Sequence, residues 1–393
     1  MTGRQARARP HRRNGSYSTF TIQPSIATMK RKLSVIHFLS IVLAFSLLAG
    51  YKISNAAPPD GSKTVMVSTF AGGGATYPES GDFADGTGSA ARFMNPRGIT
   101  IDASDNLYVV DSNRIRKVSP KGEVSTLAGS DKSDYANGIR DAARFNVPYS
   151  IAVDASGNLY VADMANHRIR KVSPKGEVST LAGDGKYGFA DGTGSAAKFA
   201  HPCGIAVDAA GNLYVADRDN HRIRKVSPKG EVSTFVGGKY GFAEGTGSAA
   251  RFAQPCGIAI DTVGNLYVAD GENYRVRKVT PKGEVSTLAS GRGKQGFASP
   301  FGITIDKAGN VYITAIASSI YKITQDGKVR TLAGSGPTDS EAIGFADGPG
   351  NTARFAIPGG IAIDKTGNLY VADEGNMRIR KLVFVTHSAP EAD

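Results

Sequence analysis

The chain has 393 residues, 48 of them glycine, and a formal net charge of +12 at pH 7. Residues 1–60 contain nine Lys or Arg and one acid, so +8 of this charge lies there and +4 is left for residues 61–393. This near balance argues against binding a polyanion through bulk charge, and the two cysteines do not have the spacing of a zinc site.

The first predicted element is an export segment. Residues 1–32 form a basic N-terminus, residues 33–50 are the only long apolar run, and small residues follow up to position 57. This order is typical of a secretory signal, and about 18 apolar residues can also span a bilayer as an uncleaved anchor. We therefore predict a signal peptide or membrane anchor at 33–57 and a linker at 58–64. Met29 is an alternative start to Met1.

This segment predicts export. The rest of the chain is expected to be periplasmic or secreted, or held outside the cytoplasm by the anchor. Contact with a membrane is expected only through residues 33–50, if they are not cleaved.

From residue 65 onward the chain is an internal repeat. Each unit contains a copy of Gly-Asn-Leu-Tyr-Val-Ala-Asp, a basic run such as Arg-Ile-Arg-Lys-Val, and Val-Ser-Thr-Leu-Ala-Gly. Spacings between units run from 45 residues (Pro255 to Pro300) to 58 (Pro300 to Pro358), and such periods are typical of propellers, solenoids or arrays. The units open at Pro96, Pro148, Pro202, Pro255, Pro300 and Pro358.

Each unit predicts four short strands. The runs are rich in β-branched and aromatic residues and are separated by turn sequences, with no helical period. We therefore predict an all-β fold, a six-bladed β-propeller of four-stranded antiparallel blades over residues 65–386, with a tail at 387–393.

The last unit supplies only three strands. Residues 65–72 repeat the amino-acid sequence of a fourth strand, although they precede the first strand of the first unit. Because a propeller must protect the edges of its first and last blades, we predict that this N-terminal strand completes blade six.

The loop sequences Asn166-His167-Arg168 and Asn220-His221-Arg222 resemble the motif of the NHL-repeat proteins. The resemblance covers roughly residues 65–385 and implies a six-bladed propeller. The absence of Trp argues against Trp-Asp repeats. NHL propellers bind proteins or nucleic acids or act as sensors, while related six-bladed propellers include lactonases and lyases, so the resemblance does not choose the function.

An acid that ends the second strand of a unit recurs opposite an Arg that begins the third. A catalytic group is needed once and a structural one in every blade, so we interpret these as structural ion pairs; a carboxylate ring for metal or catalysis is the alternative. Repeat five breaks the pattern with Ala315. The pairs are Asp111 with Arg114, Asp163 with Arg168, Asp217 with Arg222, Asp270 with Arg275 and Asp373 with Arg378.

Other candidate ligands are few. His167 and His221 occupy equivalent loop positions but lack a third partner for a metal, and the link motif Phe83 to Phe93 has too few acids for calcium. We predict no catalytic residue, no metal and no cofactor. Cys203 and Cys256 hold the same position in successive repeats, as a disulfide or as two small residues; a bond requires Cα atoms within about 7 Å.

Because the strands of a unit alternate in direction, the turn between the second and third strands and the link to the next unit lie on one face of the propeller, the top face. The other turns lie on the bottom face and are nearly identical between repeats, whereas the top turns differ. A specific partner needs an asymmetric surface, which only the top face offers. The link before Pro300 is short and predicts a notch beside blade five. The predicted binding residues are Glu272, Asn273, Tyr274, Phe301, Ile316, Ser318 and Tyr321.

The sequence thus predicts an exported, non-enzymatic scaffold that binds a protein, peptide or glycan through its top face. A metal-assisted propeller enzyme of the lactonase or lyase type is the alternative. RNA binding is the third hypothesis, and nucleic acid is not the expected partner.

Overall fold

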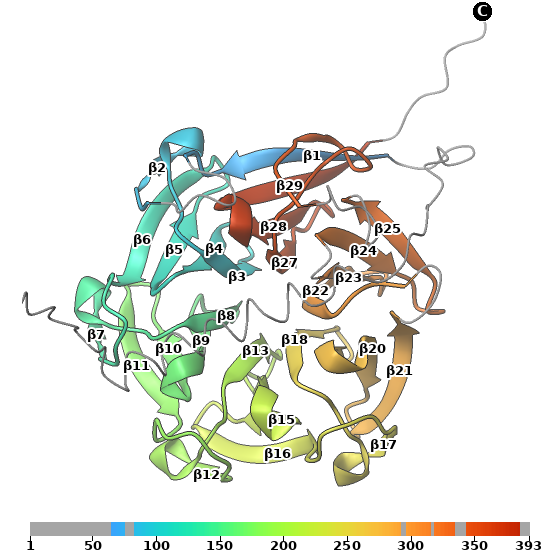
Figure 1. The fold of residues 1–393 in the computed structure, drawn as a ribbon. Helices are drawn as coiled ribbons and strands as arrows, with labels where there is room; N and C mark the ends of the chain where they lie inside the picture. Colours follow the sequence, from blue (N-terminus) through green and yellow to red (C-terminus); the bar gives the residue numbers. More distant parts are fainter. Residues whose placement is uncertain (1–63, 75–81, 292–295, 316–317, 335–342, 386–393) are drawn as a thin grey trace, which may run out of the picture. The chain divides into compact units, whose positions relative to one another are not determined.

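A computed structural model describes residues 64–74, 82–291, 296–315, 318–334 and 343–385. They form six antiparallel sheets around a common centre (Figure 1), which confirms the six-bladed propeller. The described residues contain no α-helix, only short 3-10 turns, and none of their helical segments could cross a membrane. The predicted signal or anchor at 33–57 and the tail at 387–393 lie outside the described residues.

In each blade the first strand lines the centre and the later ones follow outward. The first strands are β3 (Pro96–Ile101), β8 (Pro148–Val153), β13 (Pro202–Val207), β18 (Pro255–Ile260), β22 (Pro300–Ile305) and β27 (Pro358–Ile363). The second strands are β4 (Leu107–Asp111), β9 (Leu159–Asp163), β14 (Leu213–Asp217), β19 (Leu266–Asp270), β23 (Val311–Ala315) and β28 (Leu369–Asp373).

The third strands contain the basic runs, and the fourth strands contain the Val-Ser-Thr sequence. The third strands are β5 (Arg114–Val118), β10 (Arg168–Val172), β15 (Arg222–Val226), β20 (Arg275–Val279), β24 (Ser319–Ile323) and β29 (Arg378–Val385). The fourth strands are β6 (Glu123–Gly129), β11 (Glu177–Ala182), β16 (Glu231–Gly237), β21 (Glu284–Ser290), β25 (Val329–Ala333) and β1 (Thr64–Ala71).

The N-terminal strand closes the ring. β1 pairs antiparallel with β29, with Val67 opposite Leu382, and both side chains are buried. β27 of the same blade packs beside β3 of blade one. The predicted closure of blade six is therefore confirmed.

The links between blades add a strand that the sequence did not predict. Among the described residues five blades have five strands, because a two-residue strand from the preceding link pairs with the outermost long strand; blade five, β22 to β25, has four. These fifth strands are β2 (Gly86–Thr87), β7 (Gly138–Ile139), β12 (Gly192–Thr193), β17 (Gly245–Thr246) and β26 (Gly348–Pro349).

The described residues contain two sets of short 3-10 turns. One set follows fifth strands and comprises η1 (Gly88–Ala90), η2 (Arg140–Ala142), η4 (Gly194–Ala196) and η6 (Gly247–Ala249). The other set joins the second and third strands and comprises η3 (Met164–Asn166), η5 (Arg218–Asn220), η7 (Gly271–Asn273) and η8 (Glu374–Asn376).

The bottom turns follow from their residues. Asp208 Oδ1 accepts backbone hydrogen bonds from Ala210 (3.0 Å) and Asn212 (2.8 Å), and Gly211 has a φ of +81°, which glycine adopts without a Cβ penalty. Repetition of this turn in every blade makes the bottom face uniform.

Each gap between blades is filled by a phenylalanine from the link. Phe199 is fully buried and packs with residues of blades two and three, among them Ala162 and Leu213, and burial of such a ring contributes about 1.5–3 kcal/mol. Phe93, from the link before blade one, is buried in the same way. At the centre the first strands approach so closely that a Cβ on Gly204 would lie 1.9 Å from the Cys256 carbonyl oxygen.

Candidate functional site

A buried network fixes five of the six blades and accounts for most of the repeated charged residues. The carboxylate of Asp163 accepts hydrogen bonds from Asn146 N–H (2.9 Å), Asn166 Nδ2 (2.9 Å) and Arg170 Nη1 (2.7 Å). Arg170 in turn donates to the carbonyl oxygens of Arg144 (3.1 Å) and Ala136 (2.8 Å). Both side chains of the ion pair are completely buried. The network therefore ties the second strand, the third strand and the link together.

The ion-pair partner differs from the predicted one by two positions. Arg168 is the cross-strand neighbour of Asp163, but its guanidinium donates to the carbonyls of Asn166 and Asp184 and lies 3.9 Å from the Tyr135 ring centroid. The predicted partners Arg114, Arg168, Arg222, Arg275 and Arg378 are corrected to Arg116, Arg170, Arg224, Arg277 and Arg380 for Asp111, Asp163, Asp217, Asp270 and Asp373.

The acid of the link motif is a second partner of the same arginine. Asp85 lies 2.8 Å from Arg116. Asp191 lies 2.5 Å from Arg224, and Asp347 lies 2.5 Å from Arg380. The motif therefore anchors the link to its blade.

Blade five lacks every part of this network in the described residues. Ala315 replaces the acid, and Tyr321 stands where the other blades have the buried arginine. The described part of the link before Pro300, residues 296–299, contributes no fifth strand, and Phe297 is the buried plug of this gap. These losses are consistent with one another, because a buried guanidinium without a carboxylate and link carbonyls is costly.

The predicted binding residues divide into accessible and buried positions. Glu272 is exposed, and Tyr274 and Phe301 are partly exposed. Asn273 is buried and donates to Asp270 and to the Gly241 carbonyl. Ser318 and Tyr321 are buried at 0% and 1% exposure, which contradicts their predicted contact with a ligand. Ile316 lies outside the described residues.

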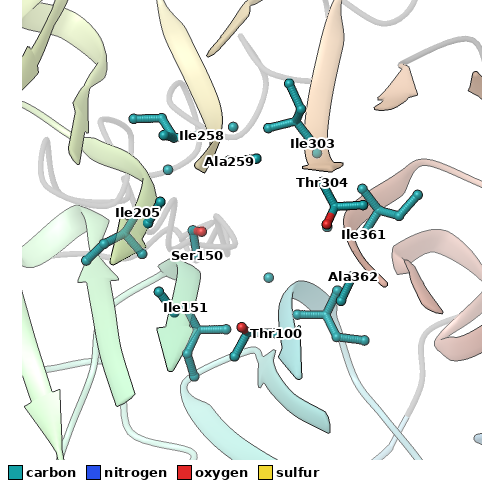
Figure 2. Close-up of a pocket in the computed structure, with 18 of the residues that line it drawn as sticks. Thr100, Ser150, Ile151, Ile205, Ile258, Ala259, Ile303, Thr304, Ile361 and Ala362 are labelled. Atoms are coloured by element: carbon teal, nitrogen blue, oxygen red, sulfur yellow. The ribbon is translucent and has the colours of Figure 1, made fainter. Parts of the chain in front are cut away.

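The centre of the ring holds a cavity with a volume of about 270 Å³, lined by the first strands of all six blades. Figure 2 shows the hydroxyl side chains of Thr100, Ser150 and Thr304 among isoleucine and alanine side chains. No carboxylate is among the lining residues.

Larger side chains surround the top entrance of this cavity. Tyr149 is buried with Cys203 and Cys256, and Phe301 packs against this group, with the rings of Tyr149 and Phe301 5.3 Å apart. Cys203 and Cys256 form a disulfide with a Cα–Cα distance of 5.2 Å. The sequence left this bond open, because it does not give the distance between the first strands.

A charged pair completes the entrance. Arg97 Nε donates to Glu374 Oε1 at 3.0 Å, and the two side chains are 21% and 18% exposed. Burial disfavours the Arg97 charge, but Glu374 outweighs it and raises the pKa of Arg97. Burial and the negative charge of Glu374 also raise the pKa of Tyr149, so its phenol is neutral at neutral pH. Sequence reasoning did not single out Arg97, Tyr149 or Glu374.

A cluster of rings lies on the top face between blades two and three. His201 Nδ1 is 2.6 Å from Asp219 Oδ2, and the His201 backbone N–H donates to His167 Nδ1 at 3.3 Å. The centroids of His167 and His201 are 4.8 Å apart, and Tyr187 lies 5.6 Å and 5.4 Å from them. Burial and His201 lower the pKa of His167 to about 4, so this ring is neutral at neutral pH.

A related cluster lies between blades three and four. His221 accepts a hydrogen bond from Gln254 N–H at 3.4 Å, and its ring lies 5.1 Å from that of Tyr240. The charge of Glu272 and its hydrogen bond raise the pKa of Tyr240. Tyr187 and Tyr240 are 59% and 61% exposed, more than any other Tyr or Phe side chain among the described residues.

The described residues do not assemble a metal site. No group of three or more His, Cys, Asp and Glu among them is placed to hold an ion. The two histidines predicted as candidate ligands, His167 and His221, belong to different clusters.

Comparison with known proteins identifies the repeats. The family model of the Teneurin NHL domain matches residues 56–141, and that of the NHL repeat matches residues 145–172, 199–226 and 355–382.

Two curated relatives are each 30% identical to the chain. The chloroplastic protein SUPPRESSOR OF QUENCHING 1 of Arabidopsis thaliana matches over 76% of this chain and 26% of its own length. NHL repeat-containing protein 2 of Bos taurus matches over 77% of this chain and 40% of its own length. The chain thus spans less than half the length of these relatives.

A similar solved structure shows the fold alone. A gluconolactonase from Xanthomonas campestris has a TM-score of 0.55 and 13% identity, over 86% of this chain and 99% of that chain. Together with the repeat matches and the sheet topology, these findings identify the chain as an NHL-repeat protein with a six-bladed β-propeller.

Proposed function

We propose that this chain is an exported binding protein whose top face takes a protein or peptide partner. The exposure of Tyr187 and Tyr240, each packed beside a histidine, carries the proposal. Tyrosine supplies a large and rigid contact area with a polar end, and it is enriched at protein interfaces.

The position of these rings supports one binding surface. Met164 belongs to η3 and packs against the group at the cavity entrance, while His167 follows the same turn. Residues of the entrance and of the ring clusters therefore come from the same top-face turns. These turns differ between blades, whereas the bottom turns repeat, so the top face offers the asymmetry that a specific partner requires.

The disulfide supports export. Bonds of this kind persist in oxidising compartments such as the periplasm or the extracellular space and are rare in the cytosol. Cys203 and Cys256 are the two cysteines of the chain, and both are bonded.

A capture experiment with the full chain tests the binding role. Immobilised wild type, Tyr187→Ala/Tyr240→Ala, and Val263→Ala as a control are incubated with a cell-envelope extract and, separately, with a glycan array. Val263 is 72% exposed on a bottom turn. We expect a partner that the wild type and the control retain and that the double variant loses by at least about tenfold, since two aromatic contacts contribute more than about 1.4 kcal/mol.

Equal capture by all three proteins would contradict the assignment of the top face. Binding only on the glycan array would indicate that the partner is a glycan and not a protein. A steep fall of binding with salt would instead favour RNA.

A further inference from the structure

We propose that the outer edge of blade five, at β25, is a binding site for an extended acidic peptide. This site lies on a different strand from the top-face clusters and does not depend on the function proposed for them.

The edge of blade five is exposed where its counterparts are covered. In the other blades the matching valines are 2–4% exposed: Val67, Val124, Val178, Val232 and Val285. Val329, the equivalent residue of β25, is partly exposed, and Thr331 is exposed. β25 is the last strand of its sheet among the described residues, so no described strand pairs with its outward backbone groups, and such an edge is a template for pairing with another chain.

The molecule itself shows what kind of segment covers such an edge. In blade three, Gly192 of the fifth strand pairs with Val232, and the preceding Asp191 accepts hydrogen bonds from the backbone N–H and the hydroxyl of Thr234 (3.3 and 3.4 Å). Blade six repeats this with Asp347 and Thr69, at 3.0 Å for both contacts. The covering segment is therefore an acid followed by a glycine with positive φ (+147° for Gly192 and +128° for Gly348) and one further paired residue.

Blade five retains the residues that hold the covering segment in the other blades. Thr331 occupies the position of Thr234, so its N–H points outward by the same register. Gly327 matches Gly122 of blade one, whose carbonyl accepts a hydrogen bond from Gly88 N–H at 2.9 Å. A peptide with an acid directly before a glycine could pair with β25 as the fifth strands pair elsewhere.

The charge of this edge favours an acidic partner. Arg330 is exposed and makes no ion pair with a described residue, whereas the equivalent positions of the other blades are Ser68, Ser125, Ser179, Ser233 and Ser286. Lys328 is also exposed and lies 2.8 Å from Asp326. A second copy of β25 would place the Arg330 side chains against one another, and like charges on paired strands repel, so a partner peptide fits better than self-association.

The test uses the full chain and a labelled peptide with the sequence of residues 188–197, which contains Asp191, Gly192 and Thr193 and no Lys or Arg. Fluorescence anisotropy measures binding, and hydrogen exchange maps it. We expect saturable binding and slower exchange in residues 328–334. Replacing the aspartate of the peptide by Asn should weaken binding about tenfold, since it removes a charge-assisted contact.

Two variants of the protein test whether the peptide binds at this edge. Thr331→Pro removes one outward N–H, which an edge strand tolerates, and should weaken binding about tenfold. Arg330→Glu reverses the charge without touching the backbone and should abolish the preference for the acidic peptide. Val263→Ala and Tyr187→Ala/Tyr240→Ala should bind the peptide as the wild type does. The peptide test therefore does not depend on whether the proposed binding role of the top face is correct.

The following outcomes would overturn the proposal. These are no binding by the wild type, equal binding by Thr331→Pro, Arg330→Glu and the wild type, or protection from exchange outside residues 328–334. Formation of dimers through this edge would overturn it as well.

Discussion

Asp163 and Arg170, seven residues apart on neighbouring strands, form a buried ion pair with 2.7 Å between Oδ2 and Nη1. The Arg170 guanidinium also lies between the rings of Tyr135 and Phe145, 4.8 and 5.2 Å from their centroids. The same arrangement in five blades makes it a structural element of the repeat.

Replacing Arg170 by Met should lower the free energy of unfolding by about 3–5 kcal/mol, because it leaves the Asp163 carboxylate buried without its cation. Denaturant titration measures the change. The control is Lys171→Met on the same strand, whose partly exposed side chain should cost less than about 1 kcal/mol. In Asp163→Ala/Arg170→Met the cost should be well below the sum of the single variants; additive costs would contradict coupling.

The sequence predicted the parts of the fold that repeat. Four strands per unit, the bottom turns and the closing strand β1 depend on local patterns, and the fourth-strand text at residues 65–72 was visible without a structure. The fifth strands were missed because two residues carry no periodicity.

The site was predicted less well, because it depends on how links wrap around blades. Register alone places Arg168 opposite Asp163, and only the packed link shows why Arg170 is the partner. An alignment of the third strands predicts that Tyr321 is buried, since it occupies the position of the buried arginine in the other units. The disulfide and the Arg97–Glu374 pair join different blades, and distances between blades are not encoded in one unit.

Reduction of the disulfide should destabilise the propeller. Cys203 and Cys256 are 53 residues apart, and closing a loop of this length contributes about 4 kcal/mol by loss of entropy in the unfolded chain. Denaturant titration with and without reductant measures the effect. The Cys203→Ser/Cys256→Ser variant is the control and should not respond to reductant; an unchanged wild type would show that the bond contributes nothing.

Stability should decrease in mild acid because of His167. Burial and His201 lower its pKa to about 4, whereas an unfolded histidine titrates near about 6.5. Between these pH values the unfolded chain takes up a proton that the folded protein excludes, so the free energy of unfolding falls as the pH drops from about 6.5 to about 4. Above this window His167 adds no pH dependence.

Denaturant titration at pH 7.5 and pH 5 tests this expectation. His167→Gln should reduce the difference between the two pH values, and Lys186→Gln, an exposed change in the same link, should not. Asp184, Arg168, Asp219 and His201 also act on His167, so its removal should leave a smaller slope. An identical slope in His167→Gln and the wild type would contradict the assignment.

Placing an arginine in blade five should be costly even though five other blades contain one. Tyr321→Arg would bury a cation beside Ala315, which stands in place of the aspartate of the other blades, and should cost about 3–5 kcal/mol. Adding Ala315→Asp supplies the carboxylate but not the link carbonyls that Ala136 and Arg144 provide in blade two, so it should restore only part of the loss. Tyr321→Phe, the control, should cost about 1 kcal/mol or less. Wild-type stability of Tyr321→Arg would mean that this slot does not need the link network.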